Sequence, residues 1–404
     1  MALDRPARII LLACLPALCL GFSNVVLFPV WSAMVSADTG IAIETLLSVA
    51  SAESLATGLA SVLYAAVGFR RPISSSLREG LVLILLANAV LAWALATGRD
   101  SFSVIIAARL VAGVGEGWTI AAALARIGRS RDADRIFVLN QLAIGLFAAS
   151  MFGALPHLSH FAARYGQPSA AVFAALAILC CICLPLARLA DGDDIKPVAQ
   201  SAAPAAVGWR GGIAIVMVFC IFAGATQIYS SWGRIAAELR LPIEVFSGML
   251  GIGALAGMAA LLVMIAVSRR IRPLVTIGFC LLLMSGAALI STHASLLPVA
   301  LWRGTFTLAI CVEQVASLAI APLLLQVLAS TDASGRTVSA APMGTMVGSI
   351  VGPFVAAFVS RTLGLFAIGW TTIAFYALGL MLLGLLYFAG SREIQQARAR
   401  ATRA

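Results

Sequence analysis

The sequence predicts an all-α integral membrane protein with twelve transmembrane helices. Of its 404 residues, 61% are hydrophobic and only 11% are charged, and the mean hydropathy is +1.02. Soluble domains have a far more polar composition. The apolar residues also come in repeated runs, each close to the roughly 20 residues that a helix needs to cross a bilayer core about 30 Å thick. Because lipid offers backbone groups no hydrogen-bond partner, each run is expected to be helical.

Twelve such runs follow one another along the chain, separated by clusters of Arg, Asp, Gly and Pro. The first run follows Arg5 and Arg8, as in a signal peptide, but it is long and has no clear cleavage site before Trp31, so we expect it to be retained. The predicted spans are residues 9–35, 46–69, 80–98, 103–125, 136–156, 169–189, 212–232, 244–267, 274–292, 296–328, 339–360 and 365–388.

The basic residues are distributed unevenly between the loops on the two sides. With a cytoplasmic N-terminus, 20 of the 27 Lys and Arg residues lie in cytoplasmic segments, five lie in the opposite loops, and Arg109 and Arg303 lie inside spans. This bias predicts cytoplasmic termini, as in a bacterial-type inner membrane protein. The net charge of +10 is then explained by contact with anionic headgroups, and nothing predicts binding to nucleic acid.

The chain divides into two halves at residues 190–207, its only long polar interval. We therefore predict an N-terminal six-helix bundle at 1–189, a cytoplasmic linker, and a C-terminal six-helix bundle at 208–404.

The two halves repeat some of their features. Trp31 near the end of span one has a counterpart in Trp232 near the end of span seven, and Arg109 at the start of span four has a counterpart in Arg303 at the start of span ten. This pattern indicates a parallel internal repeat with pseudo-symmetric bundles.

This layout resembles the major facilitator superfamily over the whole chain. The stretch from Arg109 to Gly117, Arg-Leu-Val-Ala-Gly-Val-Gly-Glu-Gly, is similar to the family's fourth-span signature of an arginine followed by glycines. The loop after span two departs from the family's Gly-x-x-x-Asp-Arg-x-Gly-Arg-Arg pattern, because residues 68–72 read Gly-Phe-Arg-Arg-Pro and lack the acid. The resemblance implies a secondary transporter in which two bundles rock about a midplane cavity.

Charged residues of the cytoplasmic loops are candidates to replace the missing gate. Acids in the loops after spans four and ten can pair with arginines after spans two and eight, although solvated loop charges are an equally good interpretation. The candidate gating residues are Arg70, Arg71, Asp132, Asp134, Arg135, Arg269, Asp332 and Arg336.

Three glutamates lie well inside predicted spans: Glu53, Glu116 and Glu313. Charge is expensive in the bilayer core, so intramembrane carboxyls usually face an interior cavity and are paired or protonated. Removal from water disfavours the charged form of a carboxyl. We therefore predict that these three groups couple transport to protons, with helix-tying hydrogen bonds or ion pairs as the alternative.

Other polar and aromatic residues at similar depths are candidates for binding a solute. Guanidinium groups bind carboxylates bidentately, so the two span arginines favour an anionic solute, unless they form fixed ion pairs. Arg109 and Glu116 lie on one helix face, about 10 Å apart along its axis, so we expect no direct neutralisation between them. The candidate substrate-binding residues are Asn24, Arg109, Trp118, Gln227, Tyr229, Arg303 and Gln314.

Several other functions find no support in the sequence. No nucleotide-binding loop is present, and a dinucleotide-like pattern at residues 251–256 lies inside an apolar span with no strand before it. His157 and His160 lack a third metal ligand, so no metal is expected. No nucleophile has a paired base. We therefore expect neither an enzyme nor a cofactor, and a monomer whose partners are a small solute, protons and the lipid bilayer.

The direction of transport stays open at this point. The family's exporters carry a Gly-Pro-rich signature in span five, whereas here such a stretch, residues 344–353, lies in span eleven. Proton-coupled export of an amphipathic or anionic compound is slightly favoured, and proton-coupled uptake of a nutrient is the alternative. A membrane scaffold or sensor that does not transport is an alternative of another class.

Overall fold

The computed structural model describes residues 5–67, 71–99, 101–128, 130, 133–164, 167–191, 208–267, 271–331 and 336–401. This part of the chain is almost entirely helical and contains no strand. Within it, twelve helical segments are long and apolar enough to cross a membrane. They follow the order of the twelve predicted runs, so the predicted fold class is confirmed.

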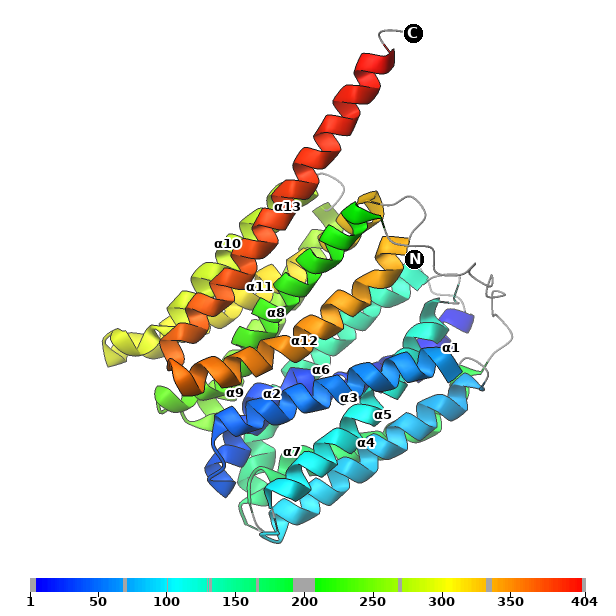
Figure 1. Cartoon of the computed structure of the whole chain (residues 1–404). Coiled ribbons are helices and arrows are strands. Elements are labelled where there is room, and N and C mark those ends of the chain that lie inside the picture. Colours follow the sequence, from blue (N-terminus) through cyan, green and yellow to red (C-terminus); the bar gives the residue numbers. More distant parts are fainter. Residues whose placement is uncertain are drawn as a thin grey trace. The chain divides into compact units, whose positions relative to one another are not determined.

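The helices of the first half alternate with short connections (Figure 1). Helices α4 and α5 pack along their lengths, as do α3 and α5. The elements are α1 (Arg5–Gly21), α2 (Ser23–Thr39), α3 (Ile43–Val67), α4 (Ile73–Ala96), α5 (Phe102–Gly128), α6 (Ala133–Ala162), α7 (Ala170–Leu186) and the short 3-10 helix η2 (Ala187–Ala190).

The second half has the same character, with α10 packed on both α11 and α13. Its elements are α8 (Trp209–Glu238), α9 (Ile243–Val267), α10 (Pro273–Thr292), η3 (Ala294–Leu296), α11 (Val299–Thr331), α12 (Arg336–Thr362) and α13 (Leu365–Ala401).

By its internal contacts the chain forms two compact units. The first comprises Met1–Ala202 together with Ser230–Leu255, and the second comprises Ala203–Tyr229 together with Ala256–Ala404. The segment Ser230–Leu255 therefore packs with the first unit although it follows the linker, and an ion pair between Arg234 and Glu44 lies within that unit. The division into bundles at 1–189 and 208–404 stays a prediction.

The first span is interrupted in its middle. A turn at Phe22 separates α1 from α2 within one apolar segment, Arg8–Thr39. The first N–H groups of a helix have no partner inside that helix. The break therefore places the first N–H groups of α2, among them that of Asn24, near the centre of the span, where a side chain can accept from them.

Glycines allow two helix pairs to approach closely. A Cβ added to Gly113 of α5 would lie 2.6 Å from the Glu53 carbonyl oxygen on α3. In the second unit, a Cβ on Gly348 of α12 would lie 2.8 Å from the Phe219 carbonyl oxygen on α8. Small residues at four-residue spacing are typical of tightly packed membrane helices, so the repeated glycines of both halves act in helix packing.

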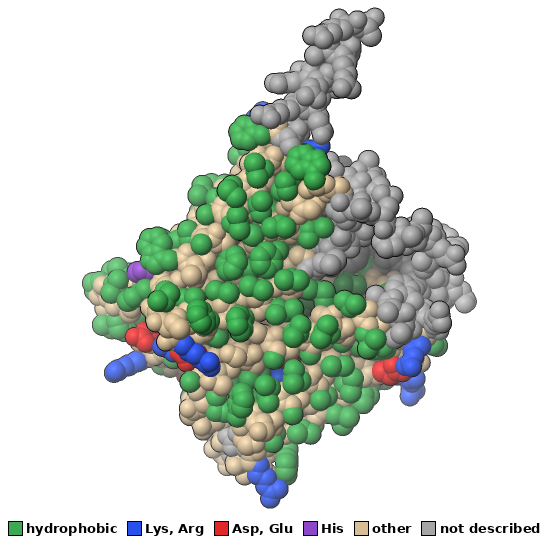
Figure 2. Space-filling view, in the orientation of Figure 1, with side chains coloured by type: hydrophobic (Ala, Val, Ile, Leu, Met, Phe, Trp, Pro, Cys, Tyr) green, Lys and Arg blue, Asp and Glu red, His purple; other side chains and the backbone are tan. Residues whose placement is uncertain are grey.

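The described surface is largely apolar. Figure 2 shows hydrophobic side chains spread over the helices and charged side chains confined to a few small groups. On α3, for example, Leu59 and Val62 are 63% and 64% exposed. Such exposure would be unfavourable in water, and it fits helices that face lipid acyl chains.

Candidate functional site

Three of the almost completely buried charged side chains of the first unit lie close together on α3 and α5. Glu53 of α3 is 0% exposed, and Arg109 and Glu116 of α5 are 1% and 2% exposed. Buried charges are stable only when they are paired and hydrogen-bonded. The Glu53–Arg109–Glu116 triad, as we call these residues, is therefore the first place to look for function.

Arg109 and Glu53 form a bidentate pair. The Arg109 Nε donates to Glu53 Oε2 at 2.9 Å, and its Nη2 donates to Glu53 Oε1. This fork geometry matches a guanidinium to a carboxylate and makes a strong charge-assisted pair. Gly113, one turn along α5, allows the pair to form because any side chain there would push α3 away at Glu53.

A shell of polar and aromatic groups surrounds Arg109. Its Nη1 donates to Asn88 Oδ1 of α4 at 3.3 Å, and its Cζ lies 5.4 Å from the ring centre of Trp31 and 5.8 Å from that of Phe173. Trp31 in turn donates its Nε1 hydrogen to Asn24 Oδ1 at 3.1 Å. The guanidinium is thus held by hydrogen bonds in its plane and by aromatic rings nearby.

Glu116 has a different environment from Glu53. Its Oε1 lies 3.7 Å from Arg109 Nη2, too far for a hydrogen bond, and this buried oxygen accepts none. The backbone N–H of Asn24 and the hydroxyl of Thr57 lie near the same carboxyl group, although the hydroxyl donates to the Glu53 carbonyl oxygen at 3.0 Å. The start of α2, with its favourable dipole, therefore faces Glu116.

The expectation that Arg109 and Glu116 do not neutralise each other directly needs a correction. Although they lie two turns apart on α5, their side chains approach to 3.7 Å. The reason is that the long, flexible Arg109 side chain extends along the helix face and brings its guanidinium near the Glu116 carboxyl group. One guanidinium therefore serves two carboxyl groups, and Glu53 has the stronger hold on it.

Among the described residues of the second unit, one acid, Glu313, is buried, and its partner differs from those in the first unit. Glu313 of α11 is 3% exposed, and its Oε1 accepts a hydrogen bond from the Tyr376 hydroxyl of α13 at 3.1 Å. The Tyr376 side chain belongs to a large apolar cluster with Ile277, Leu281 and Met284 of α10. Glu313 Oε2 is buried without a hydrogen-bond partner, and within the described residues no cation pairs with Glu313.

The remaining candidate binding residues range from fully buried to exposed. Gln227 of α8 is fully buried and donates to the Thr371 hydroxyl at 2.6 Å, whereas Tyr229 and Gln314 are half-buried. Trp118 of α5 stacks edge-on against Tyr64, with ring centres 5.2 Å apart. Arg303, the counterpart of Arg109 in the sequence, is exposed near the start of α11. Of the candidate binding residues, Asn24 and Arg109 belong to the group of contacts described above for the first unit.

The candidate gate is only partly visible. Arg71 forms an exposed ion pair with Glu79 of α4, with 3.2 Å between Nη1 and each carboxylate oxygen. Glu79 is a partner that we did not predict. Arg70, Asp132, Arg269 and Asp332 lie outside the described residues, and the side chains of Asp134, Arg135 and Arg336 are likewise outside the description.

Two partners of the buried charged residues, Asn88 of Arg109 and Tyr376 of Glu313, were not foreseen from sequence. Asn88 lies among apolar residues in the third span, and Tyr376 lies in the twelfth. An isolated polar side chain inside a span was the signal for Asn88, because such groups usually hydrogen-bond to another helix. Tyr376 gave no comparable signal, since tyrosine also occurs at apolar and interfacial positions.

Comparison with known families decides what kind of protein this is. The model of the Major Facilitator Superfamily matches residues 13–341. The chain belongs to this superfamily. As a member it is a transporter of the secondary kind, a multi-pass protein of the membrane. No curated protein sequence matches the chain at a significant level.

Two solved structures share the fold of this superfamily member. The human organic anion transporter MFSD10 (TETRAN) has a TM-score of 0.63 at 18% sequence identity, covering 94% of this chain and 100% of its own. A D-xylose-proton symporter has a TM-score of 0.67 at 14% identity, covering 94% and 96%. At these identities the likeness concerns the fold alone.

Proposed function

We propose that this superfamily member couples the movement of a small organic solute to protons by alternating access, with Glu116 and Glu313 as the groups that bind and release the proton. The observation that carries the proposal is that each of these buried carboxyl groups has an oxygen without a hydrogen-bond partner. A charged oxygen in that condition is costly, whereas a protonated carboxyl is not.

The count of charges supports this assignment in the first unit. Two carboxyl groups share one guanidinium, so the triad is electrically neutral when one proton is bound. Arg109 holds Glu53 through two hydrogen bonds, which favours the charged form of Glu53 and leaves the proton to Glu116. Glu53 then acts as the fixed counter-ion of Arg109 and not as a proton carrier.

For direction, we propose export in exchange for protons. A solute that offers an N–H or O–H group can compete with the proton for Glu116 Oε1, and such competition is what exchange requires. Arg109 favours this mode because its fork is already occupied by Glu53. An amphipathic solute with a hydrogen-bond donor fits this chemistry and the aromatic rings of Trp31 and Phe173 nearby.

A second candidate is symport of an anion with a proton. Protonation of Glu53 would release the Arg109 fork for a carboxylate-bearing solute. We consider this alternative because two proteins that share the fold are an organic anion transporter and a proton symporter.

The test begins with the solute. Metabolite and drug profiling of cells that lack or overproduce the protein identifies compounds to assay, and flux is then measured in proteoliposomes with and without a pH gradient. We expect the gradient to drive accumulation by wild type, and Glu116→Gln and Glu313→Gln each to abolish that response. Glu238→Gln, an exposed acid at the end of α8, is the matched control.

The same preparation separates the alternatives. Exchange makes an outward solute gradient drive protons inward, whereas symport moves both in one direction, as a pH-sensitive dye inside the vesicles reports. If Glu116→Gln and Glu313→Gln both respond to the pH gradient as wild type does, these acids do not couple transport. Absence of any flux with every profiled compound would favour a scaffold or sensor.

A further inference from the structure

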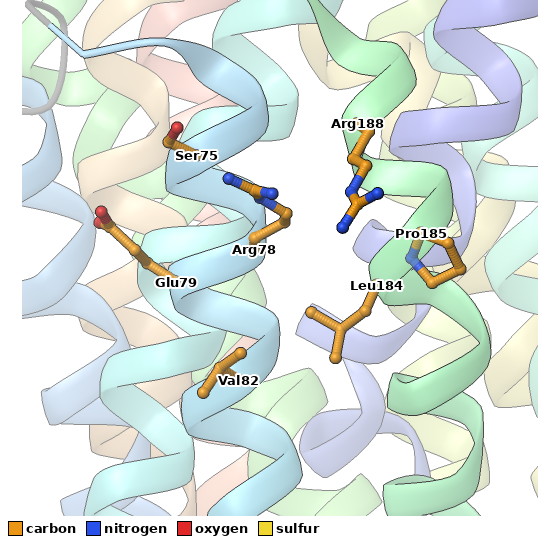
Figure 3. Close-up of a pocket in the computed structure, with 7 residues that line it drawn as sticks. All are labelled: Ser75, Arg78, Glu79, Val82, Leu184, Pro185 and Arg188. Atoms are coloured by element: carbon orange, nitrogen blue, oxygen red, sulfur yellow. The ribbon is translucent and has the colours of Figure 1, made fainter.

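A second feature, separate from the buried acids, is a cavity of about 630 Å³ between α4 and the end of α7. Its walls come from two helices that pack against each other within the first unit. Figure 3 shows the residues that line it: Ser75, Arg78, Glu79 and Val82 of α4, Leu184 and Pro185 of α7, and Arg188 of η2.

Two like charges line this cavity. Figure 3 shows Arg78 on α4 and Arg188 on η2 on opposite walls of the cavity. Within the described residues neither forms an ion pair, and the Arg78 Nε is buried without a hydrogen-bond partner. Glu79 also lines the cavity, and its carboxylate is paired with Arg71, with 3.2 Å between Nη1 and each oxygen. An anion placed between the two arginines would remove their repulsion and satisfy their donors.

The lining of the cavity changes from charged to apolar along α4 and α7. Arg78 lies near the start of the span Ile73–Ala96, and Arg188 near the end of the span Ala170–Ala190. Val82 lies one turn deeper on α4, and Leu184 and Pro185 lie about one turn deeper on the other wall. The site thus offers cations at the membrane boundary and an apolar surface toward the bilayer core.

The ends of the two walls are tied together, so the cavity is built into the fold. Asp191, directly after η2, accepts hydrogen bonds from the backbone N–H of Ser74, at 3.0 Å, and from its hydroxyl. The Arg126 Nε donates to the Ala190 carbonyl at 2.8 Å. These contacts fix η2, and with it the backbone of Arg188, against the first turn of α4.

We propose that this cavity binds an anionic phospholipid, whose phosphodiester lies between Arg78 and Arg188 and whose acyl chain lies on Val82, Leu184 and Pro185. A phosphate has the oxygens that two guanidinium forks require. The gradation from charge to hydrocarbon selects an amphiphile over a soluble anion. The proposal does not depend on which solute is transported or on proton coupling.

The test is native mass spectrometry of the detergent-purified full chain, titrated with phosphatidylglycerol or with phosphatidylcholine. We expect one phosphatidylglycerol to bind in preference to phosphatidylcholine. A basic residue near an anionic headgroup contributes about 1 kcal/mol, so Arg78→Gln and Arg188→Gln should each weaken binding about fivefold, and the double variant more. Arg99→Gln, an exposed arginine beyond the opposite end of α4, is the matched control and should bind as wild type does.

Two further arms distinguish the other possible occupants. Inorganic phosphate is titrated in place of lipid, and the linker variant Asp193→Asn/Asp194→Asn is titrated with phosphatidylglycerol. Phosphate that binds as tightly as the lipid would assign the site to a soluble anion. Lipid binding by the linker variant but not by wild type would mean that Asp193 and Asp194 pair with Arg78 and Arg188 and exclude the lipid. Either result, or equal lipid binding by wild type and the Arg78→Gln/Arg188→Gln double variant, overturns the proposal.

Discussion

The two units bury acids in opposite ways. In the first, Glu53 and Glu116 share Arg109, which also contacts Asn88. In the second, Glu313 has a tyrosine hydroxyl as its hydrogen-bond donor, and within the described residues it pairs with no cation. The first arrangement stabilises charge inside the protein, whereas the second stabilises a neutral carboxyl group far better than a charged one. The two units therefore stabilise their buried acids in two different ways, by a shared arginine in the first and by a tyrosine hydroxyl in the second.

The largest expected effect comes from removing the shared cation. Arg109→Gln leaves two buried carboxyl groups without a positive partner, and breaking a buried ion pair in this way costs about 3–5 kcal/mol. We expect a large loss of thermal stability in detergent and no transport. Arg303→Gln, an exposed arginine at the corresponding position of the other half, should melt close to wild type. Equal melting temperatures for the two variants would mean that the buried ion pairs of Arg109 do not contribute to stability.

The next largest difference is expected when Glu53 and Glu313 are neutralised, because of these two acids only Glu53 forms an ion pair within the described residues. Glu53→Gln breaks the bidentate pair of Arg109, so we expect it to lower the melting temperature clearly. Glu313→Gln keeps an acceptor for Tyr376 and removes no ion pair, so we expect it to fold as wild type does and to lose only the response to a pH gradient.

The measurement is a thermal unfolding series of both variants beside flux in proteoliposomes. A Glu313→Gln protein that unfolds as readily as Glu53→Gln would show that Glu313 is held by an ion pair after all. Retained pH-driven flux in Glu313→Gln would remove this residue from the coupling mechanism.

Helix packing around the triad can be perturbed without touching a charge. Gly113→Ala puts a methyl group 2.6 Å from the Glu53 carbonyl oxygen, so α3 and α5 must separate, at a cost of about 1–3 kcal/mol. Gly153→Ala on α6 meets no atom within 4 Å and is the matched control. The comparison is made by thermal melting, and a neutral Gly113→Ala would mean that the close contact is not required.

The smallest effect is expected from Tyr376→Phe. This change deletes one hydrogen bond to Glu313 and keeps the ring in its apolar cluster, so the stability should fall by about 1 kcal/mol. Transport should persist at a reduced rate, because the carboxyl group itself remains. Complete loss of transport with normal folding would promote Tyr376 to a direct participant in proton transfer.

The twelve spans could be predicted because hydropathy acts within each segment and needs no knowledge of its neighbours. The buried acids could be predicted for a related reason, since charge inside a span is rare. Their partners could not. The Glu53–Arg109 pair joins residues 56 positions apart, and it depends on the glycine contact between α3 and α5.

The matched arginines illustrate the same difference between local pattern and packing. Sequence spacing predicts that Arg109 and Arg303 correspond to each other in the two halves, yet Arg109 is 1% exposed and Arg303 lies on the surface. Sequence spacing carries the symmetry of the two halves. Sequence spacing does not predict which neighbouring helix packs over a given residue, because that depends on side chains from several spans at once.

The interruption of the first span at Phe22 has a consequence for biogenesis. The first span is synthesised well before the helix that carries Glu116, so the amide of Asn24 enters the bilayer without this acceptor beside it. An unsatisfied amide in hydrocarbon costs several kcal/mol, which favours a continuous helix at that stage. We therefore expect the newly inserted segment to be one continuous helix, and the interruption at Phe22 to form only when the fourth span docks.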